Sequence, residues 1–241
     1  MFSGLLTELG KNLLFVLEFL AVVAVLLIAA YVVEKWEKKH NGSTERVLST
    51  RKIAMIGMFS AIAAVLMFFE VPMPFAPNFY KIDLSELPVL IAAFAFGPVA
   101  GVLVEFVKII LNLITDSTTT AFVGELANFA VGCSFILPAS IIYTFKKSKK
   151  QAIIACVAGT LAMTIFGSAF NAIYLLPKFA ELYGMPLEAI VGMGTAINPA
   201  ITDVNSLVLM AVVPLNVLKG SIVSLLTILI YKKLSAIIKA H

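Results

Sequence analysis

Long uninterrupted apolar stretches restrict what this 241-residue chain can fold into. The first runs from Asn12 to Val33 and exceeds the roughly 20 residues that an α-helix needs to cross a bilayer. Hydrophobic residues make up 61% of the chain and charged residues 13%, a balance that no soluble domain of this length can bury. Because irregular backbone is not satisfied in lipid, we interpret the chain as an all-α integral membrane protein.

Seven such segments are expected to span the lipid bilayer. The first is too long for a signal peptide and lacks a preceding cationic segment, so we expect it to be retained. The third and fourth are short and meet at Gly97-Pro98, which predicts a tight turn between an irregular or tilted pair. The expected spans cover 12–33, 53–69, 84–96, 99–114, 124–145, 152–176 and 204–231.

The positions of Lys and Arg set the expected orientation. Cationic clusters lie in 35–52, 146–150 and 232–239, whereas the segments 70–83, 115–123 and 177–203 carry only Lys81 and Lys178 as cations. Cytoplasmic loops are enriched in Lys and Arg, so the six later spans should begin and end inside the cell. We therefore expect a multi-pass plasma-membrane protein with a cytoplasmic C-terminus and a first helix that enters from outside.

This pattern predicts three segments. They are an extra transmembrane helix (1–34), a cytoplasmic polar linker (35–52) and a six-helix membrane domain (53–241). The formal net charge of +4 comes from the loop clusters, and we interpret it as a topology signal and not as a nucleic-acid footprint.

Two outer segments are expected to act as lids over a cavity. The segment 70–83 combines three prolines with aromatic residues, so it should be stiff, non-helical and still apolar. The long connection 177–203 is rich in Gly, Pro and Met and is a second candidate. An interfacial aromatic belt is the alternative interpretation of the first segment.

Polar side chains inside the spans need a partner or a role. Asn216 and Lys219 have i,i+3 spacing and share one helix face, and a Lys near mid-span costs on the order of 3 kcal/mol on insertion scales. This favours a ligand-facing role for the pair. Asn128 and Asn171 can also face a ligand or join helices through hydrogen bonds.

Two further patterns point to packing. Glu105 and Lys108 have the same i,i+3 spacing and are expected to neutralise each other as a structural pair. Small residues from Ala54 to Ala64 allow close helix approach, either within the bundle or to another membrane subunit.

Several catalytic signatures are missing from the sequence. It contains no Gly-x-x-x-x-Gly-Lys-[Ser/Thr] phosphate loop, no His-Glu-x-x-His and no His, Cys and carboxylate cluster typical of a catalytic metal. An ATPase or zinc hydrolase is therefore not expected, and energy for transport would come from another subunit.

Together, four motifs make the chain resemble the substrate-binding S components of energy-coupling factor (ECF) vitamin transporters, and among them the riboflavin-specific type. The resemblance extends from Arg51 to Ala240. The motifs are Lys81–Pro88 (KIDLSELP), Phe96–Gly101 (FGPVAG), Gly124–Phe129 (GELANF) and Asn216–Gly220 (NVLKG).

The resemblance implies a six-helix core that binds riboflavin from outside, beneath the two lids. It further implies docking onto a shared transmembrane coupling subunit driven by two cytoplasmic ATPases, so that the chain itself is no enzyme and needs no cofactor or metal. The extra first helix has no place in the six-helix core of the family.

The resemblance also implies roles for particular residues. The heteroatom edge of the isoalloxazine would meet Asn128, Asn171, Asn216 and Lys219, and its rings would lie under Phe79 and Tyr80. Further residues implied at the substrate site are Asp83, Glu125, Leu126 and Tyr174. Those implied to meet the coupling subunit are Gly57, Ser60, Ala61 and Ala64.

Other functions stay open at this point. The chain could bind another vitamin or a flavin nucleotide, or act as a non-catalytic scaffold subunit. A membrane-embedded lipid-modifying enzyme that uses Asp83, Glu125 and Lys219 near the interface is a further alternative.

Overall fold

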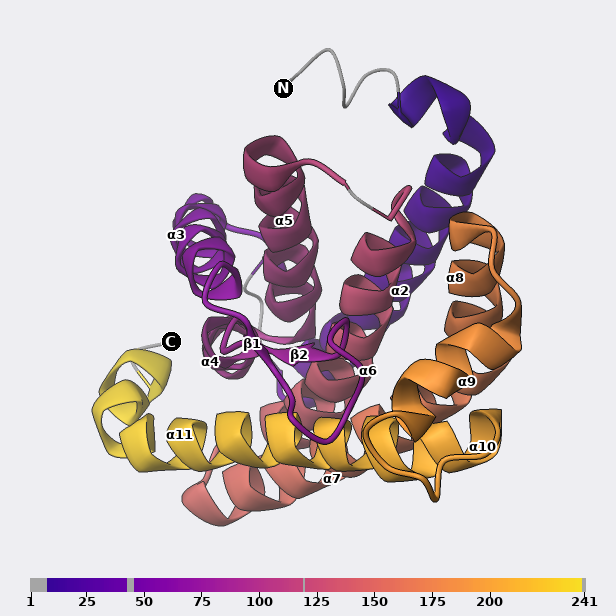
Figure 1. Ribbon diagram of the computed structural model, residues 1–241. Helices are drawn as coiled ribbons and strands as arrows, with labels where there is room; N and C mark the ends of the chain where they lie inside the picture. The colour runs from indigo at the N-terminus through magenta and orange to yellow at the C-terminus, as the bar shows by residue number, and fades with distance from the viewer. Residues whose placement is uncertain (1–7, 43–45, 119, 240–241) are drawn as a thin grey trace.

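The computed structural model describes residues 8–42, 46–118 and 120–239, with side chains up to residue 230. It is a bundle of α-helices with one short β-hairpin lying across it (Figure 1). The longer helices are α2 (Leu13–His40), α3 (Thr50–Met67), α4 (Glu86–Phe96), α5 (Pro98–Asp116), α6 (Val123–Phe145), α7 (Lys149–Phe170) and α11 (Val213–Lys239).

Shorter elements connect these helices on the side of the hairpin. Strands β1 (Val71–Pro72) and β2 (Lys81–Ile82) pair antiparallel within the expected first lid. The π-helical turns η1 (Asn171–Leu175) and η2 (Val208–Val212) interrupt two of the long helical runs. The remaining short helices are α8 (Leu176–Tyr183), α9 (Leu187–Thr195) and α10 (Val204–Leu207).

The expected all-α membrane fold is confirmed. Within the described residues, six helices are long and apolar enough to cross a membrane, at 13–40, 50–67, 98–116, 123–145, 149–183 and 204–230. The expected span at 84–96 forms only the 11-residue helix α4, which is about 16 Å long and shorter than the hydrocarbon core. Gly97 ends it with a positive φ of 96°, and Pro98 begins α5.

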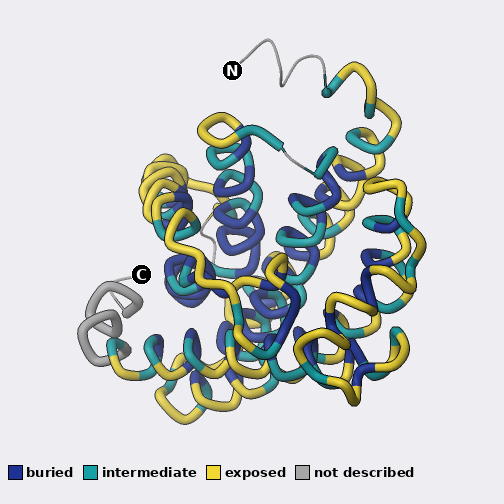
Figure 2. Tube along the Cα trace, viewed as in Figure 1, coloured by how far each residue is buried: buried dark blue, intermediate teal, exposed yellow. Residues whose placement is uncertain are grey.

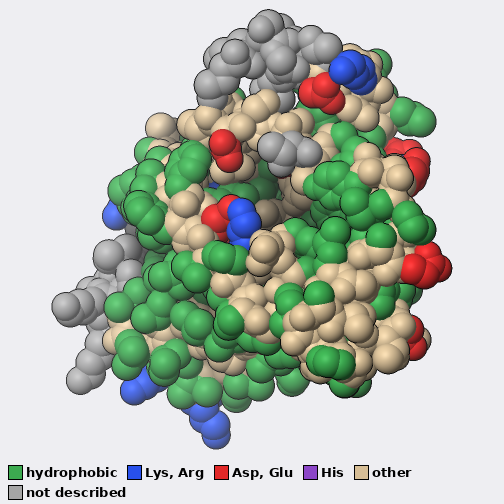
Figure 3. Space-filling view, viewed as in Figure 1, with side chains coloured by type: hydrophobic (Ala, Val, Ile, Leu, Met, Phe, Trp, Pro, Cys, Tyr) green, Lys and Arg blue, Asp and Glu red, His purple; other side chains and the backbone are tan. Residues whose placement is uncertain are grey.

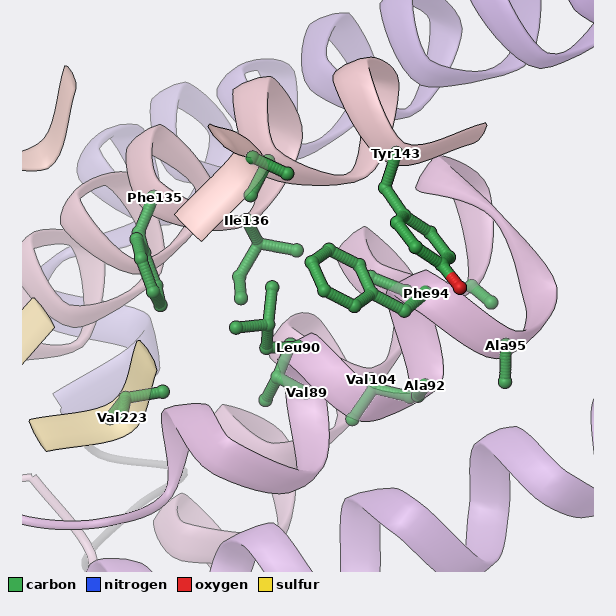
Figure 4. Close-up of a cluster of buried hydrophobic side chains, with 14 of the residues drawn as sticks. Val89, Leu90, Ala92, Phe94, Ala95, Val104, Phe135, Ile136, Tyr143 and Val223 are labelled. Atoms are coloured by element: carbon green, nitrogen blue, oxygen red, sulfur yellow. The ribbon is translucent and has the colours of Figure 1, made fainter. Parts of the chain in front are cut away.

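Helix α4 lies at the centre of the bundle. It packs against α3, α5, α6 and α11, and ten of its 11 residues are buried (Figure 2). The main hydrophobic core forms around it, and the rings of Phe94 and Tyr143 stack there at 4.3 Å between centroids (Figure 4). A short buried helix can therefore stand among the membrane-crossing helices without facing lipid.

The extra first helix is part of this packing. Helix α2 lies along α5 and α6, where Phe19 and Val23 are buried in a second cluster with Phe129. The helix also continues past the expected boundary at residue 34 to His40. Its outward side exposes large apolar side chains such as Leu14 and Ile28, as expected of a helix surrounded by lipid.

The expected outer connection 177–203 is largely helical. It contains α8 and α9, which the composition of this segment did not predict. Pro186 does not prevent α9, because it lies at the N-cap, where a missing N–H is harmless, and Pro177 directly follows the π-helical turn η1.

Candidate ligand-binding site

The two predicted lids pack on each other. Tyr80 and Ile82 of the hairpin segment share a buried cluster with Ile190 and Val191 of α9 and with Ile201. Figure 3 shows the same face of the molecule hollowed near its centre, where basic and acidic side chains lie together among apolar ones. The lids therefore form one apolar layer above the ends of the helices that carry the predicted polar residues.

A hydrogen bond joins the first lid to the end of α7. The Tyr80 hydroxyl donates to Asn171 Oδ1 at 3.0 Å, and Asn171 Nδ2 donates to the Gly167 carbonyl at 2.8 Å. Asn171 opens the π-helical turn η1. Burial raises the pKa of the Tyr80 phenol well above its usual value, so Tyr80 stays a neutral donor at physiological pH.

Lys219 projects from α11 toward two carboxylates. Its Nζ lies 3.1 Å from Asp83 Oδ2 and 3.6 Å from Glu86 Oε1, and its side chain is 13% exposed. Burial alone would raise the pKa of Asp83, but the ammoniums of Lys219 and Lys108 and hydrogen bonds from Ser85 hold it below its usual value. Asp83 is therefore a carboxylate at neutral pH and fixes the end of the first lid to α11.

Asn216 lies one turn before Lys219 and is also buried. Its Nδ2 has no hydrogen-bond partner among the described residues, which is unusual for a buried amide. Gly167 of α7 faces this atom, and a Cβ at that position would lie 2.8 Å from it. The absent side chain at residue 167 thus lets α7 approach α11 beside the Asn216 amide.

The other predicted site residues lie in different surroundings. Phe79 is exposed beside the Tyr80 ring, and Asn128 is half-buried with no hydrogen bond to any described residue. Glu125 is buried and accepts a hydrogen bond from Thr120 Oγ1 at 3.1 Å. Leu126 and Tyr174 pack into the cluster that includes α2. Direct contacts therefore connect Tyr80 to Asn171 and to Phe79, and Asp83 to Lys219. Hydrogen bonds and ring contacts within the described part of the chain join the other residues to neither pair. These residues are Glu125, Leu126, Asn128 and Tyr174.

Sequence reasoning missed Glu86. The predicted pair Glu105 and Lys108 is confirmed, with Lys108 Nζ 2.7 Å from Glu105 Oε1, but the same ammonium lies 3.0 Å from Glu86 Oε1. Ser85 Oγ also accepts from Lys108 at 3.1 Å. The i,i+3 spacing of Asp83 and Glu86 within the KIDLSELP motif was the available signal.

The small residues of α3 divide between two faces. Ser60 and Ala64 are buried, and Ser60 Oγ donates to the Ile56 carbonyl at 2.8 Å. Gly57 and Ala61 are exposed, and the space beside Gly57 is open. A partner could therefore meet only the second pair without unpacking the bundle.

The chain is similar to known membrane transport proteins. Residues 51–231 match the family described as ECF transporter, substrate-specific component. The chain is 38% identical to "Riboflavin transporter RibU" of Staphylococcus aureus, with 78% of this chain and 93% of that protein covered. It is 32% identical to "Riboflavin transporter FmnP" of Bacillus subtilis, with the same coverage of both chains.

A solved structure agrees with these sequence matches. The fold resembles that in "Structure and mechanism of the S component of a bacterial ECF transporter", with a TM-score of 0.61 and 38% identity. That likeness covers 78% of this chain and 98% of the other. Helix α2 lies before the family match, which begins at residue 51.

Proposed function

This chain belongs to the family of ECF transporter substrate-specific components, and from this premise we propose that it is the subunit that binds riboflavin. It is a multi-pass membrane protein of a transport family, and it binds its vitamin at the outer face beneath residues 70–83 and 177–203. The ligand is cargo, so no cofactor is invoked.

The unpartnered amide of Asn216 carries the assignment of the site. Riboflavin presents carbonyl acceptors and an N–H donor along one edge of its ring system, and a buried Nδ2 without an acceptor suits one of those carbonyls. Leaving such a donor unpaired costs about 1–3 kcal/mol, which a bound carbonyl would recover. Lys219 lies on the same helix face and adds a charged donor.

Other residues complete the proposed pocket. Tyr80 and Phe79 lie on the lid where they can cover an aromatic ring, and Asn171 fixes that lid. Four further residues stay assigned to the wall of this pocket. Glu125, Leu126 and Asn128 lie in the GELANF motif, and Tyr174 lies one turn after Asn171. We retain 53–241 as the binding domain. Of the predicted linker 35–52, residues 35–40 belong to α2 and residues 50–52 to α3.

Transport requires partners in this proposal. The coupling subunit docks against α3, and two cytoplasmic ATPases on separate chains supply the energy. The C-terminus faces the cytoplasm, because cationic residues gather there.

Riboflavin titration of the purified full-length chain tests the proposal. Quenching of flavin fluorescence should report saturable binding, and Asn216→Ala should weaken it about tenfold or more, because one buried hydrogen bond is lost. Asn12→Ala, a half-buried amide of the first helix, is the matched control and should bind normally. FMN, FAD, thiamine and pantothenate serve as competitors.

Two results would refute the assignment. Preferential binding of thiamine or pantothenate would move the chain to another vitamin within the same family. Full riboflavin affinity in Asn216→Ala would show that the heteroatom edge of the riboflavin ring system does not depend on Asn216 of α11.

A further inference from the structure

A cluster of buried charges lies directly behind Lys219. Glu86 of α4 and Glu105 and Lys108 of α5 are at most 1% exposed, far from any counter-ion in solvent. Lys108 Nζ contacts both carboxyl groups, at 3.0 Å and 2.7 Å, and Lys219 links Glu86 to Asp83. The five groups therefore form one continuous network through the bundle.

The charges in this network do not balance. Asp83, Glu86 and Glu105 supply three carboxyl groups, whereas Lys108 and Lys219 supply two ammoniums. The nearby thiol of Cys133 on α6 is buried and adds no positive charge. With every carboxyl group ionised, one negative charge would stay uncompensated in the membrane interior, where it is strongly disfavoured.

Hydrogen bonding shows where the imbalance lies. Among the described residues the Oε2 atoms of Glu86 and Glu105 receive no hydrogen bond, and Glu105 Oε1 has only its ion-pair contact with Lys108 Nζ. If both groups were carboxylates, each Oε2 would have two buried lone pairs without a donor, which is rare. Both Oε1 atoms lie within 3.0 Å of the same Lys108 Nζ, so the two carboxyl groups are close neighbours.

Gly132 of α6 allows the two acids to approach. A Cβ at residue 132 would overlap Glu105 Oε1 and would lie 3.1 Å from Glu86 Oε1. No larger residue fits there without moving the carboxyl groups apart. The surface of α6 at Gly132 therefore accommodates the carboxyl groups of both Glu86 and Glu105.

We propose that Glu86 and Glu105 together bind one proton, which makes the network behind Lys219 electrically neutral. The proton lies on the Glu105 side, because Glu86 is the carboxylate that both lysines approach. Two carboxyl groups in contact cannot both ionise easily, so they titrate as a unit. This proton site is independent of the identity of the transported vitamin.

Infrared spectroscopy of the purified full-length chain tests the site. A protonated carboxyl group has a C=O stretch at higher frequency than a carboxylate, and this band shifts in D2O. The wild type should show the band at neutral pH, and Glu105→Gln and Glu86→Gln should each lose it, because either variant leaves two carboxylates facing two ammoniums. Glu181→Gln, which removes an exposed carboxylate on α8, is the control and should keep it.

Thermal unfolding supplies a second measurement. Glu105→Gln should fold and melt close to the wild type, since Gln has the shape of the protonated acid and can still donate a hydrogen bond. The double variant Glu86→Gln/Glu105→Gln should melt much lower, because Lys108 loses both counter-ions. A wild-type band that survives both single substitutions, or a Glu105→Gln variant that melts as low as the double variant, would overturn the shared proton.

Discussion

Asn216 and Lys219 share one face of α11 but would meet the proposed ligand under different conditions. The Asn216 amide has a free donor, so a ligand carbonyl adds a hydrogen bond without breaking one. Lys219 is already held by Asp83 and Glu86, so a ligand must share it with two carboxylates. We therefore expect Asn216 to contribute affinity and Lys219 to contribute both affinity and structure.

Replacing Lys219 separates these two contributions. Lys219→Met should lower riboflavin affinity and also destabilise the fold by about 3–5 kcal/mol, because Asp83 is left as a buried charge without its main partner. Thermal melting and riboflavin titration measure the two effects. The double variant Lys219→Met/Asp83→Asn removes the orphaned charge and should restore the melting temperature without restoring binding. Recovery of binding in the double variant would show that Lys219 acts only as a counter-ion.

The sequence predicted which polar side chains share a helix face, but it did not predict their distant partners. The i,i+3 spacing placed Asn216 with Lys219 on one helix face, and a local pattern is enough for that. The partner Asp83 lies 136 positions away, and only the packing of the hairpin segment against α11 brings the two together. Glu86 was missed for the same reason, because its partners Lys108 and Lys219 are also far from it in the sequence.

A buried hydrogen bond joins the β-hairpin segment to the end of α7. Tyr80→Phe removes the hydroxyl and leaves Asn171 Oδ1 buried without a donor, which should cost about 1–3 kcal/mol. Because this bond holds the lid, we expect riboflavin to dissociate faster while its association rate changes little. Stopped-flow fluorescence measures both rates. Tyr183→Phe, an exposed tyrosine of α8, is the matched control. An unchanged dissociation rate would mean that the lid is held by its apolar contacts alone.

Helix α2 is anchored to the bundle through Glu34. This carboxylate is 1% exposed, accepts from the backbone N–H of Val99 at 3.2 Å and lies 2.9 Å from Lys52 Nζ of α3. It therefore caps the beginning of α5 and joins three helices at once. The missing side chain of Gly97 makes room for this carboxylate, because a Cβ at that residue would lie 2.7 Å from Glu34 Oε2.

Removing the charge of Glu34 should destabilise the protein without touching the ligand site. Glu34→Gln keeps an acceptor for Val99 but leaves Lys52 without its close carboxylate, so we expect a loss of about 3 kcal/mol, at the lower end for a broken buried pair. Glu37→Gln is the control, because Glu37 is buried on the same helix and its carboxyl group accepts from Asn41 Nδ2 rather than pairing with a lysine among the described residues. Thermal melting should separate the two variants, and riboflavin affinity should be the same in both. Equal melting temperatures would show that α2 is held by apolar packing.

The sequence predicted the helix boundaries well for helices that face lipid on one side. Helices α3, α5 and α6 begin and end within a few residues of the expected spans. An apolar run of this length can satisfy its backbone hydrogen bonds in a membrane by forming an α-helix. Helices α8 and α9 and the π-turns did not follow from the sequence. Hydrophobic periodicity indicates that a segment is apolar, but it does not specify a π-turn of five residues such as η1.

The whole molecule presents different surfaces on its opposite sides. Helix α2 covers the outer sides of α5 and α6, and the outward face of α3 is left exposed with Gly57 and Ala61 on it (Figure 2). Small residues in a lipid-facing helix let another helix approach closely. The added helix therefore leaves free the face that the proposed coupling subunit would use.

A bulky side chain on this face of α3 tests whether the face docks onto a partner subunit or contributes to packing within the bundle. Gly57→Leu points into open space, so it should leave the melting temperature and riboflavin affinity of the isolated chain unchanged. It should nevertheless abolish most riboflavin uptake when the chain is reconstituted with its coupling subunit and ATPases, because two helices can no longer approach closely. Ala64→Leu is the contrasting variant: Ala64 is buried, so overpacking should lower stability by about 1–3 kcal/mol before any partner is added. Normal uptake by Gly57→Leu would move the docking surface away from α3, to the exposed sides of α7 or α11.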